Sequence, residues 1–308
     1  MVDRSRLRFL RIILGQPHRY RRVRALTMGV TFAALFGVPL SGLVRLDLWG
    51  GDHRALGAPA AFVPALKMIL MAIAGFYVVT FLINLPAGRM FCGFGCPVGQ
   101  LSRFADAIDA FPADVARRHR GWVELIGFAV ALSLAVSLWW ASPAAFVSGL
   151  PGVALLATVV LVAALAVLHG RRWRWNFCRQ VCPIGLYYSV VQTNAPFGID
   201  FDPTATCIDY DACRGICPVH LDPRRLGEPL PSPGGLAIDD LPALNHCLHC
   251  GACVEVCEHV TRKREGPAAM GMRMGRRTAS TAAVNASVVL RGDISDASRV
   301  ASFPGPKS

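Results

Sequence analysis

Charged side chains are scarce in this chain of 308 residues, and acidic ones are the rarer kind. Asp, Glu, Lys and Arg make up 17% of the sequence, hydrophobic residues make up 53%, and the mean hydropathy is +0.42. This composition is too apolar for an ordinary soluble domain. The 20 acidic residues face 32 Lys and Arg, which gives a net charge of +12. Because no module of interleaved basic and aromatic residues accompanies that charge, nucleic acid is not predicted as a partner.

The sequence also lacks the motifs of several enzyme classes. It has no nucleotide-binding glycine fingerprint, no catalytic triad and no recognisable substrate-pocket signature. Its eight histidines are scattered, and only His169 borders an apolar run, so two axial haem ligands cannot be placed inside a membrane bundle. Haem is therefore not among the expected cofactors. These absences favour an electron carrier over a stand-alone enzyme.

Long hydrophobic runs are present instead. An α-helix needs about 20 residues to cross a bilayer, and four runs approach that length. They are Ala25–Val44, Val63–Leu85, Trp122–Ala141 and Gly149–Leu168. We therefore predict four transmembrane helices within a membrane domain of residues 25–200, surrounded by membrane lipid.

The distribution of arginine orients this bundle. Residues 1–24 carry eight Arg against one acidic residue, and the loop 86–121 carries five Arg. The first outer loop has only two Arg, each matched by an Asp, and the second outer loop has no charge. Because basic loops stay in the cytoplasm, both termini are predicted to lie inside a bacterial inner (plasma) membrane. Residues 1–24 then form a basic cytoplasmic arm.

Eleven cysteines carry the chemistry of the chain. Four of them follow the C-x2-C-x2-C-x3-C spacing of iron–sulfur ligands, namely Cys247, Cys250, Cys253 and Cys257. A structural zinc site is the alternative, although zinc ligands usually form two separated C-x2-C pairs, often with histidine. An upstream copy has Tyr210 at its second position and keeps the other three, Cys207, Cys213 and Cys217.

Two such runs predict a small α+β domain like the bacterial two-cluster ferredoxins, at residues 201–262. In that arrangement each run lends its last cysteine to the other cluster. One ligand set is then complete and predicts a 4Fe-4S cluster on Cys217, Cys247, Cys250 and Cys253. The other set has only Cys207, Cys213 and Cys257. It could hold a 3Fe-4S cluster, no cluster, or a 4Fe-4S cluster whose fourth ligand is water or one of Asp209, Tyr210 and Asp211.

The remaining cysteines lie in two copies of the motif F-C-x3-C-P-[VI]-G. Equivalent cysteines are 86 residues apart in both cases (178 − 92 and 182 − 96), which indicates duplication of a helical hairpin plus motif. Pro97 and Pro183 suit the first turn of a helix. The second cysteine of each motif is then at a helix N-terminus, where the dipole favours a thiolate. Either all four cysteines share one cofactor site, or they form two separate redox or packing pairs: Cys92, Cys96, Cys178 and Cys182.

Two weaker patterns also lead to expectations. His246 and His249 flank cluster cysteines and could tune a potential by hydrogen bonding, but they are interpreted as surface turn residues. After Arg262 the chain is polar with little periodicity, so residues 263–308 are predicted to be a disordered tail.

These motifs together resemble the NapH/MauN-type membrane polyferredoxins, a family of ferredoxin-type iron–sulfur membrane proteins, over roughly residues 25–262. The resemblance implies a mainly α fold, with a four-helix transmembrane bundle of two repeated hairpins followed by a ferredoxin-like domain. It implies cytoplasmic clusters that pass electrons from quinol, or the quinone pool, to a partner redox protein or ferredoxin-type subunit. The pathway would be of the nitrate-reductase or the methylamine-utilisation type. Tyr210 and Glu258 depart from the family pattern and favour the methylamine-type branch.

Two other functions use the same cysteines. An accessory maturation factor would supply electrons for cofactor or metal assembly in another enzyme. A non-redox zinc-binding scaffold would use the thiols structurally, and the presence of iron with labile sulfide would exclude it.

Overall fold

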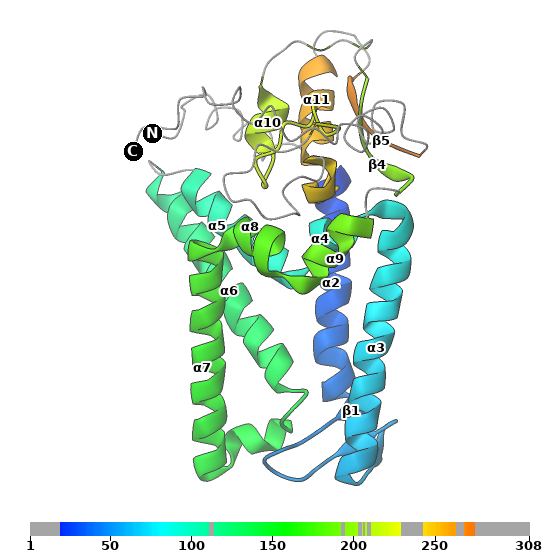
Figure 1. Ribbon diagram of the computed structural model, residues 1–308. Coiled ribbons are helices and arrows are strands. Elements are labelled where there is room, and N and C mark those ends of the chain that lie inside the picture. Colours follow the sequence, from blue (N-terminus) through cyan, green and yellow to red (C-terminus); the bar gives the residue numbers. More distant parts are fainter. Residues whose placement is uncertain are drawn as a thin grey trace, which may run out of the picture.

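The computed structural model describes residues 19–110, 114–191, 195–202, 205, 207, 211–228, 243–262 and 268–274. This part of the chain is mainly α-helical, as predicted. Four long helices run along the molecule, with a small sheet at one end and short helices plus a second sheet at the other (Figure 1).

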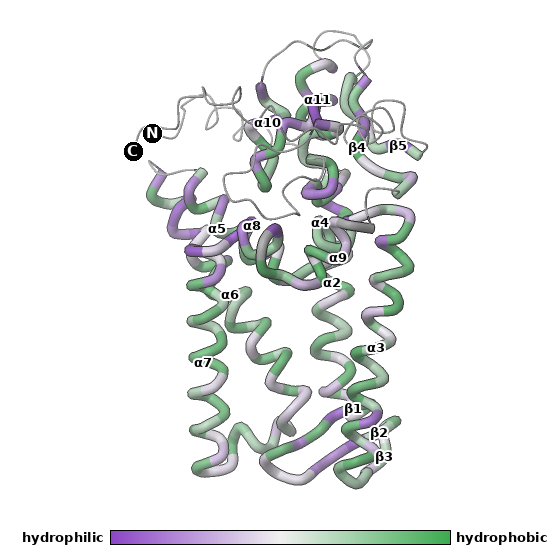
Figure 2. Tube along the Cα trace, in the orientation of Figure 1, coloured by the Kyte–Doolittle hydropathy of each residue, from purple (hydrophilic) through white to green (hydrophobic). Residues whose placement is uncertain are grey.

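The four long helices match the four apolar runs of the sequence. They are α2 (Arg19–Leu40), α3 (Phe62–Ala87), α6 (Val115–Ser137) and α7 (Gly149–Arg172). Each is long and apolar enough to cross a membrane, which confirms the predicted number of candidate spans. Their hydrophobic character continues along most of their length (Figure 2). α2 begins at Arg19, inside the predicted N-terminal arm, and residues 1–18 lie outside the described residues.

The outer face of the bundle is apolar. On α3, the hydrophobic side chains of Leu70, Val78 and Leu82 are more than half exposed, whereas Thr80 and Asn84 are buried. A soluble protein rarely leaves such a large contiguous apolar surface in contact with water. The arrangement fits a bundle that turns its apolar side to lipid and its few polar groups inward.

At one end of the bundle, short strands and a 3-10 helix connect the long helices. β1 (Val44–Arg45), β2 (Arg54–Ala55) and β3 (Ala58–Pro59) form an antiparallel sheet, and η1 (Pro143–Val147) precedes α7. The predicted charge matching of the first outer loop appears here as an ion pair between Arg45 and Asp52. The N–H of Leu46 donates to the carbonyl of Trp139 at 3.0 Å, so this loop is tied to the end of α6.

Short helices cross the opposite end of the bundle. They are α4 (Met90–Phe94), α5 (Pro97–Ala110), α8 (Arg174–Asn176), the π-helix η2 (Phe177–Val181) and α9 (Pro183–Val191). α5 buries Leu101, Ala105 and Ile108 on one face. Two of these, Leu101 and Ile108, pack in a core with residues of α6 and α7. The start of a helix predicted at Pro97 is confirmed.

The last described elements cover this end. They are β4 (Phe197–Phe201), α10 (Ala212–Ile216), the 3-10 helix η4 (Ala243–His246), α11 (Ala252–Arg262) and β5 (Met270–Met274). β4 pairs with β5 in antiparallel register, from Phe197↔Met274 to Phe201↔Met270.

The strand β5 corrects the predicted disordered tail for residues 270–274, and β4 begins within the segment assigned to the membrane domain. Ile199 and Met270 are buried in one apolar core, with Phe201 and Met272 packed against it. Local periodicity does not reveal a pairing between segments about 70 residues apart in the chain, because each strand gains its partner only on folding. Residues 275–308 lie outside the described residues.

Candidate metal centres

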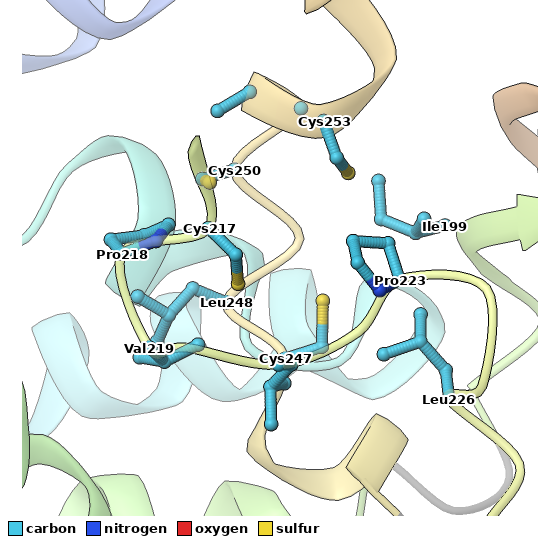
Figure 3. Close-up of a pocket in the computed structure, with 13 residues that line it drawn as sticks. Ile199, Cys217, Pro218, Val219, Pro223, Leu226, Cys247, Leu248, Cys250 and Cys253 are labelled. Atoms are coloured by element: carbon cyan, nitrogen blue, oxygen red, sulfur yellow. The ribbon is translucent and has the colours of Figure 1, made fainter. Parts of the chain in front are cut away.

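The four cysteines of the complete predicted set line one cavity (Figure 3). Cys217 follows α10, Cys247 and Cys250 lie on the loop between η4 and α11, and Cys253 lies in the first turn of α11. The rest of the lining is largely apolar and includes Ile199, Val219, Leu221, Leu226 and Leu248. Two segments that are distant in sequence thus bring four thiol groups to one largely apolar cavity.

This donor set fits an iron–sulfur cluster. Thiol sulfur is the soft ligand that such clusters use, and the apolar lining limits the access of water to them. Gly251, with φ +73°, follows Cys250, and a Cβ at this position would stand 2.6 Å from the ring of Tyr20. The loop therefore needs glycine for both its backbone conformation and its close contact with α2. Among the described residues, no group of three or more His, Cys, Asp or Glu could hold a single metal ion.

Two arginines lie beside Cys250. Burial by itself would raise the pKa of the Cys250 thiol, but Arg103 and Arg24 outweigh it and lower the pKa below its ordinary value. Arg24 donates to the Cys250 carbonyl at 2.6 Å, and Arg103 donates to the Gly93 carbonyl at 3.3 Å. Sequence reasoning assigned these arginines only to the membrane topology, because nothing local to residue 24 or 103 indicates a contact with residue 250.

The three cysteines of the incomplete set line a second cavity, so Cys207, Cys213 and Cys257 also come together. Burial raises the pKa of Cys213 to about 11. Arg224 lines the same cavity and pairs with Asp222 at 3.0 Å and with Asp211 at 2.8 Å. The carboxylate of Asp211, a predicted alternative ligand, is thus engaged by an arginine. Asp209 and Tyr210 lie outside the described residues.

The two F-C-x3-C-P motifs have the same backbone geometry. The N–H of Cys96 donates to the Phe91 carbonyl at 3.1 Å, and the N–H of Cys182 donates to the Phe177 carbonyl at 2.8 Å. Each proline then begins a helix, α5 or α9. The predicted position of the second cysteine, immediately before a helix, is therefore correct in both copies. In the second copy its sulfur accepts the N–H of Gly185 at 3.4 Å.

The glycine of each motif allows the new helix to begin close to the first cysteine. A Cβ at Gly99 would stand 3.0 Å from the Cys92 carbonyl oxygen, and one at Gly185 would stand 2.5 Å from the Cys178 carbonyl oxygen. Both contacts are with backbone, which cannot swing aside as a flexible side chain can. The sequence showed that this glycine recurs, and the structure gives the steric reason.

Burial changes the protonation expected for these cysteines. It raises the pKa of Cys96 to about 12 and the pKa of Cys178 to about 11. The predicted thiolate preference at the helix N-terminus is wrong for the free Cys96 thiol, because loss of hydration outweighs the N–H groups of Val98 and Gly99 that favour the charged form. Cys92 is also shifted upward in pKa by burial.

Arg89 joins the two motifs. Its side chain is fully buried, and its guanidinium donates to the Cys178 carbonyl at 2.7 Å and to the Ser189 hydroxyl at 3.3 Å. Its positive charge also lowers the pKa of the Cys92 thiol, against the larger effect of burial. From the sequence, Arg89 was only one of the arginines of a predicted cytoplasmic loop, because the burial of a single arginine does not change the local hydrophobic periodicity.

The first motif also contacts the loop of the first cavity. A Cβ at Gly93 would stand 2.3 Å from the Leu248 carbonyl oxygen and 3.2 Å from the Cα of Cys250. Nδ1 of His249 lies 2.9 Å from the carbonyl oxygen of Ala87, at the end of α3. His246 and His249 are both buried, so their interpretation as surface turn residues is wrong. The loop that carries them packs onto the membrane helices, and its sequence alone does not show that contact.

An open groove lies between α3 and α9. Its lining is aromatic and aliphatic, and consists of Tyr77, Val78, Phe81, Pro183, Ile184, Tyr187 and Tyr188. The hydroxyl of Tyr188 donates to the Thr80 hydroxyl at 3.4 Å. Because Pro183 directly follows Cys182, the groove extends to the second cysteine motif. No local sequence signal marks this groove, because its two sides are about 100 residues apart in the chain.

Several known proteins are similar to this chain. The ferredoxin-type protein NapH of Escherichia coli is 27% identical over 202 residues, which cover 61% of this chain and 65% of that protein. NapH of Haemophilus influenzae is 27% identical over 77% of this chain and 85% of its own length. The methylamine utilization ferredoxin-type protein MauN of Paracoccus denitrificans is 28% identical over 48% of this chain and 54% of its own length. Thus the match spans just under two thirds of the first relative. No family model and no solved structure matches.

Proposed function

We propose, from the premise that the chain is a relative of the NapH/MauN-type ferredoxin-type proteins, that it is an integral membrane protein that carries electrons between the quinone pool and a partner redox protein. One observation carries this proposal. Cys217 lines a cavity with the downstream cysteines, whereas Cys257 lines one with the upstream cysteines. Such an exchange of last cysteines is characteristic of two-cluster ferredoxins.

In the first cavity, four thiolates would hold a 4Fe-4S cluster, which supplies one-electron transfer when it is bound. The chain provides the surroundings for that chemistry. The apolar lining excludes water from the sulfurs, and Arg24 and Arg103 hold positive charge beside Cys250. Both features act on the reduction potential, which depends on charge and solvent exposure around the cluster.

The second cavity would hold a 3Fe-4S cluster, or a 4Fe-4S cluster with one non-cysteine ligand. Its three thiols fit either form, and Arg224 adds a positive charge to its lining. With only three cysteines, this site is expected to lose or exchange one iron more readily than the first. We assign electron transfer to the first site and treat the second as the subordinate one.

The groove between α3 and α9 is where we place the quinol ring. It lies beside the cytoplasmic end of the predicted spans, and three tyrosines line it, Tyr77, Tyr187 and Tyr188. Aromatic rings can stack on a quinol ring, and tyrosine hydroxyls can accept or donate hydrogen bonds to its oxygens. The exposed aliphatic side chains of α3 offer an apolar path for an isoprenoid tail.

The arginine asymmetry supports a cytoplasmic location for both cavities, as basic loops stay on that side of the membrane. The acceptor would then be a soluble or peripheral redox protein that approaches the end of the molecule formed by α10 and α11. Pathways of the kinds named for NapH and MauN are the candidates.

The experiment uses the full chain, purified anaerobically and inserted in lipid nanodiscs. The chain should contain iron and acid-labile sulfide, and a quinol analogue should produce a paramagnetic signal of a reduced cluster. Cys250→Ala should abolish that signal, whereas the control Cys207→Ala, at the other cavity, should retain it. Zinc without sulfide would contradict the proposed cofactor. Iron–sulfur clusters that no quinol analogue reduces would exclude the quinone pool as donor.

A further inference from the structure

Arg89 is a buried cation without an acidic partner in the described part of the chain. Its side chain is fully buried, and none of the ion pairs found there includes it. Its Nε has no hydrogen-bond partner among the described residues. Burying a charge without compensation costs several kcal/mol. A negative group close to Arg89 would supply that compensation. The Arg89 guanidinium donates to the neutral Ser189 hydroxyl, and its charge acts on the thiols of Cys92 and Cys178.

Contacts around Arg89 recur in reciprocal form in the two motifs. Arg89 and Trp175 are equivalent under the 86-residue offset (175 − 89), and so are Gly99 and Gly185 (185 − 99). Nη2 of Arg89 lies 3.0 Å from the Cβ position of Gly185, and Trp175 lies 3.7 Å from that of Gly99. Each motif thus places one side chain, Arg89 or Trp175, beside the glycine of the other motif.

A second reciprocal pair supports the same relation. Arg89 donates to Ser189 at 3.3 Å, and the guanidinium of Arg103 lies over the ring of Trp175, 5.3 Å from its centre. Ser189 and Arg103 are again 86 residues apart (189 − 103). Two duplicated units that contact each other through equivalent positions are related by an approximate twofold axis, so both motifs face one shared site.

The thiols of both motifs interact with one another at that site. Cys92 interacts electrostatically with the other three cysteines, and Cys178 interacts with Cys96 and Cys182. The side chains that the two motifs offer here are four thiols, and sulfur donors select soft metals and iron–sulfur clusters over magnesium or calcium.

We propose that Cys92, Cys96, Cys178 and Cys182 together bind a further iron–sulfur cluster, with Arg89 as its counter-ion. Each thiol releases its proton when it becomes a ligand. Four thiolates give the bound cluster a net negative charge, which is the compensation that buried Arg89 needs. The same charge explains why an arginine, which stays protonated in proteins, occupies this position.

This site deepens the proposed electron-transfer function because of its place in the fold. On one side, Cys182 is followed by Pro183, which lines the groove assigned to quinol. On the other side, Gly93, which follows Cys92, packs against Leu248 and Cys250 of the first cavity. The site would thus lie between the electron donor and the first ferredoxin-type cluster. Its metal content can be measured without any donor, so its failure is distinguishable from failure of the electron-transfer role.

The test removes the two ferredoxin-type sites first. The full-length variant Cys213→Ala/Cys250→Ala, purified anaerobically in nanodiscs, should retain about four iron and four labile sulfide per chain. Adding Cys92→Ala should remove them, and adding Cys178→Ala, in the other motif, should remove them equally. The proposal would be overturned if the variant without ferredoxin-type sites holds no iron although its circular dichroism shows that it is well folded.

A second measurement avoids reliance on the multiple variant. Cys92→Ala alone should lower iron by about one four-iron cluster and leave the Cys250-dependent paramagnetic signal, which also shows that the fold is intact. Arg89→Lys should keep the iron because it keeps the charge, whereas Arg89→Met should lose the same share. Unchanged iron in Cys92→Ala and Cys178→Ala would reduce the four cysteines to packing residues. If the iron contents are as expected but quinol does not reduce the clusters, the proposed site is supported and only the assignment of quinol as electron donor is refuted.

Discussion

At the scale of single residues, Arg24 and Arg103 act on one cysteine. Both lower the pKa of the Cys250 thiol against the opposing effect of burial. The same positive charges would act on a bound cluster. A reduced cluster carries one more negative charge than an oxidised one, so neighbouring cations stabilise the reduced form and raise the reduction potential.

We expect Arg103→Gln to lower the reduction potential of the Cys250-dependent cluster by on the order of 60 mV, which is a tenfold shift in a one-electron equilibrium. Glutamine keeps a hydrogen-bond donor for the Gly93 carbonyl but removes the charge. The measurement is a redox titration followed by paramagnetic resonance. Arg120→Gln is the control, because Arg120 is an exposed arginine on α6 that pairs only with Glu124. An equal shift in both variants, or a rise in potential, would contradict the assigned role of Arg103.

Local signals at individual residues explain which parts of the sites were predictable. Cysteine spacing predicted both ligand sets, and each set lines its own cavity. The arginines around them were not predicted as site residues. Their contacts join residues that are far apart, such as Arg24 with Cys250 and Arg89 with Cys178. A sequence motif reveals ligands that lie close together in the chain. It does not reveal a charged side chain that reaches the site only when a distant segment folds against it.

At the scale of elements, the turn from each F-C-x3-C motif into its helix depends on a glycine. The contact at Gly185 is the tighter one, because a Cβ there would stand 2.5 Å from a carbonyl oxygen, compared with 3.0 Å at Gly99. Both helices, α5 and α9, must move if that space is filled. A shift of α9 would also move Ser189, to which Arg89 donates.

We therefore expect Gly185→Ala to destabilise the protein by about 1–3 kcal/mol, the usual cost of overpacking, and Gly99→Ala to destabilise it less. Gly127→Ala is the matched control. Gly127 lies within α6 and has nothing within 4 Å of its Cβ position, so alanine there should be neutral or stabilising by up to ~1 kcal/mol. The measurement is thermal unfolding in nanodiscs. A ranking in which the control loses as much stability as Gly185→Ala would refute the steric account.

Element types were more predictable than their pairings. Apolar runs and proline positions predicted all four long helices and the starts of α5 and α9, because these signals depend on neighbours within a few turns. The sheet of β4 and β5 was missed, because the alternation of methionines in Met270–Met274 extends over only five residues within a largely polar segment. Its strand geometry comes from pairing with Phe197–Phe201 and from packing of Met270 on a distant core.

At the scale of the whole molecule, the two ends differ in kind. One end consists of the short connections that contain β1 to β3 and η1. There the positive charge of Arg45 is paired with the negative charge of Asp52. The other end is formed by α4, α5 and α8 to α11 (Figure 1). It carries many arginines, both cysteine motifs and both cavities. Because arginine-rich segments resist transfer across the membrane, we expect an orientation in which both cavities lie in the cytoplasm.

Reporter fusions test this orientation. Alkaline phosphatase, which is active only outside the cytoplasm, should be active when fused after Gly57 or Ser148 and inactive after Ala110 or Asp202. A fluorescent protein that matures only in the cytoplasm should give the opposite pattern. The control changes Arg117, Arg118 and Arg120 to Gln, which should weaken the retention of the loop before α6, while Arg45→Gln and Arg54→Gln in the opposite loop should have little effect. Phosphatase activity after Asp202 would place both cavities outside the cytoplasm and would remove the basis for a cytoplasmic electron acceptor.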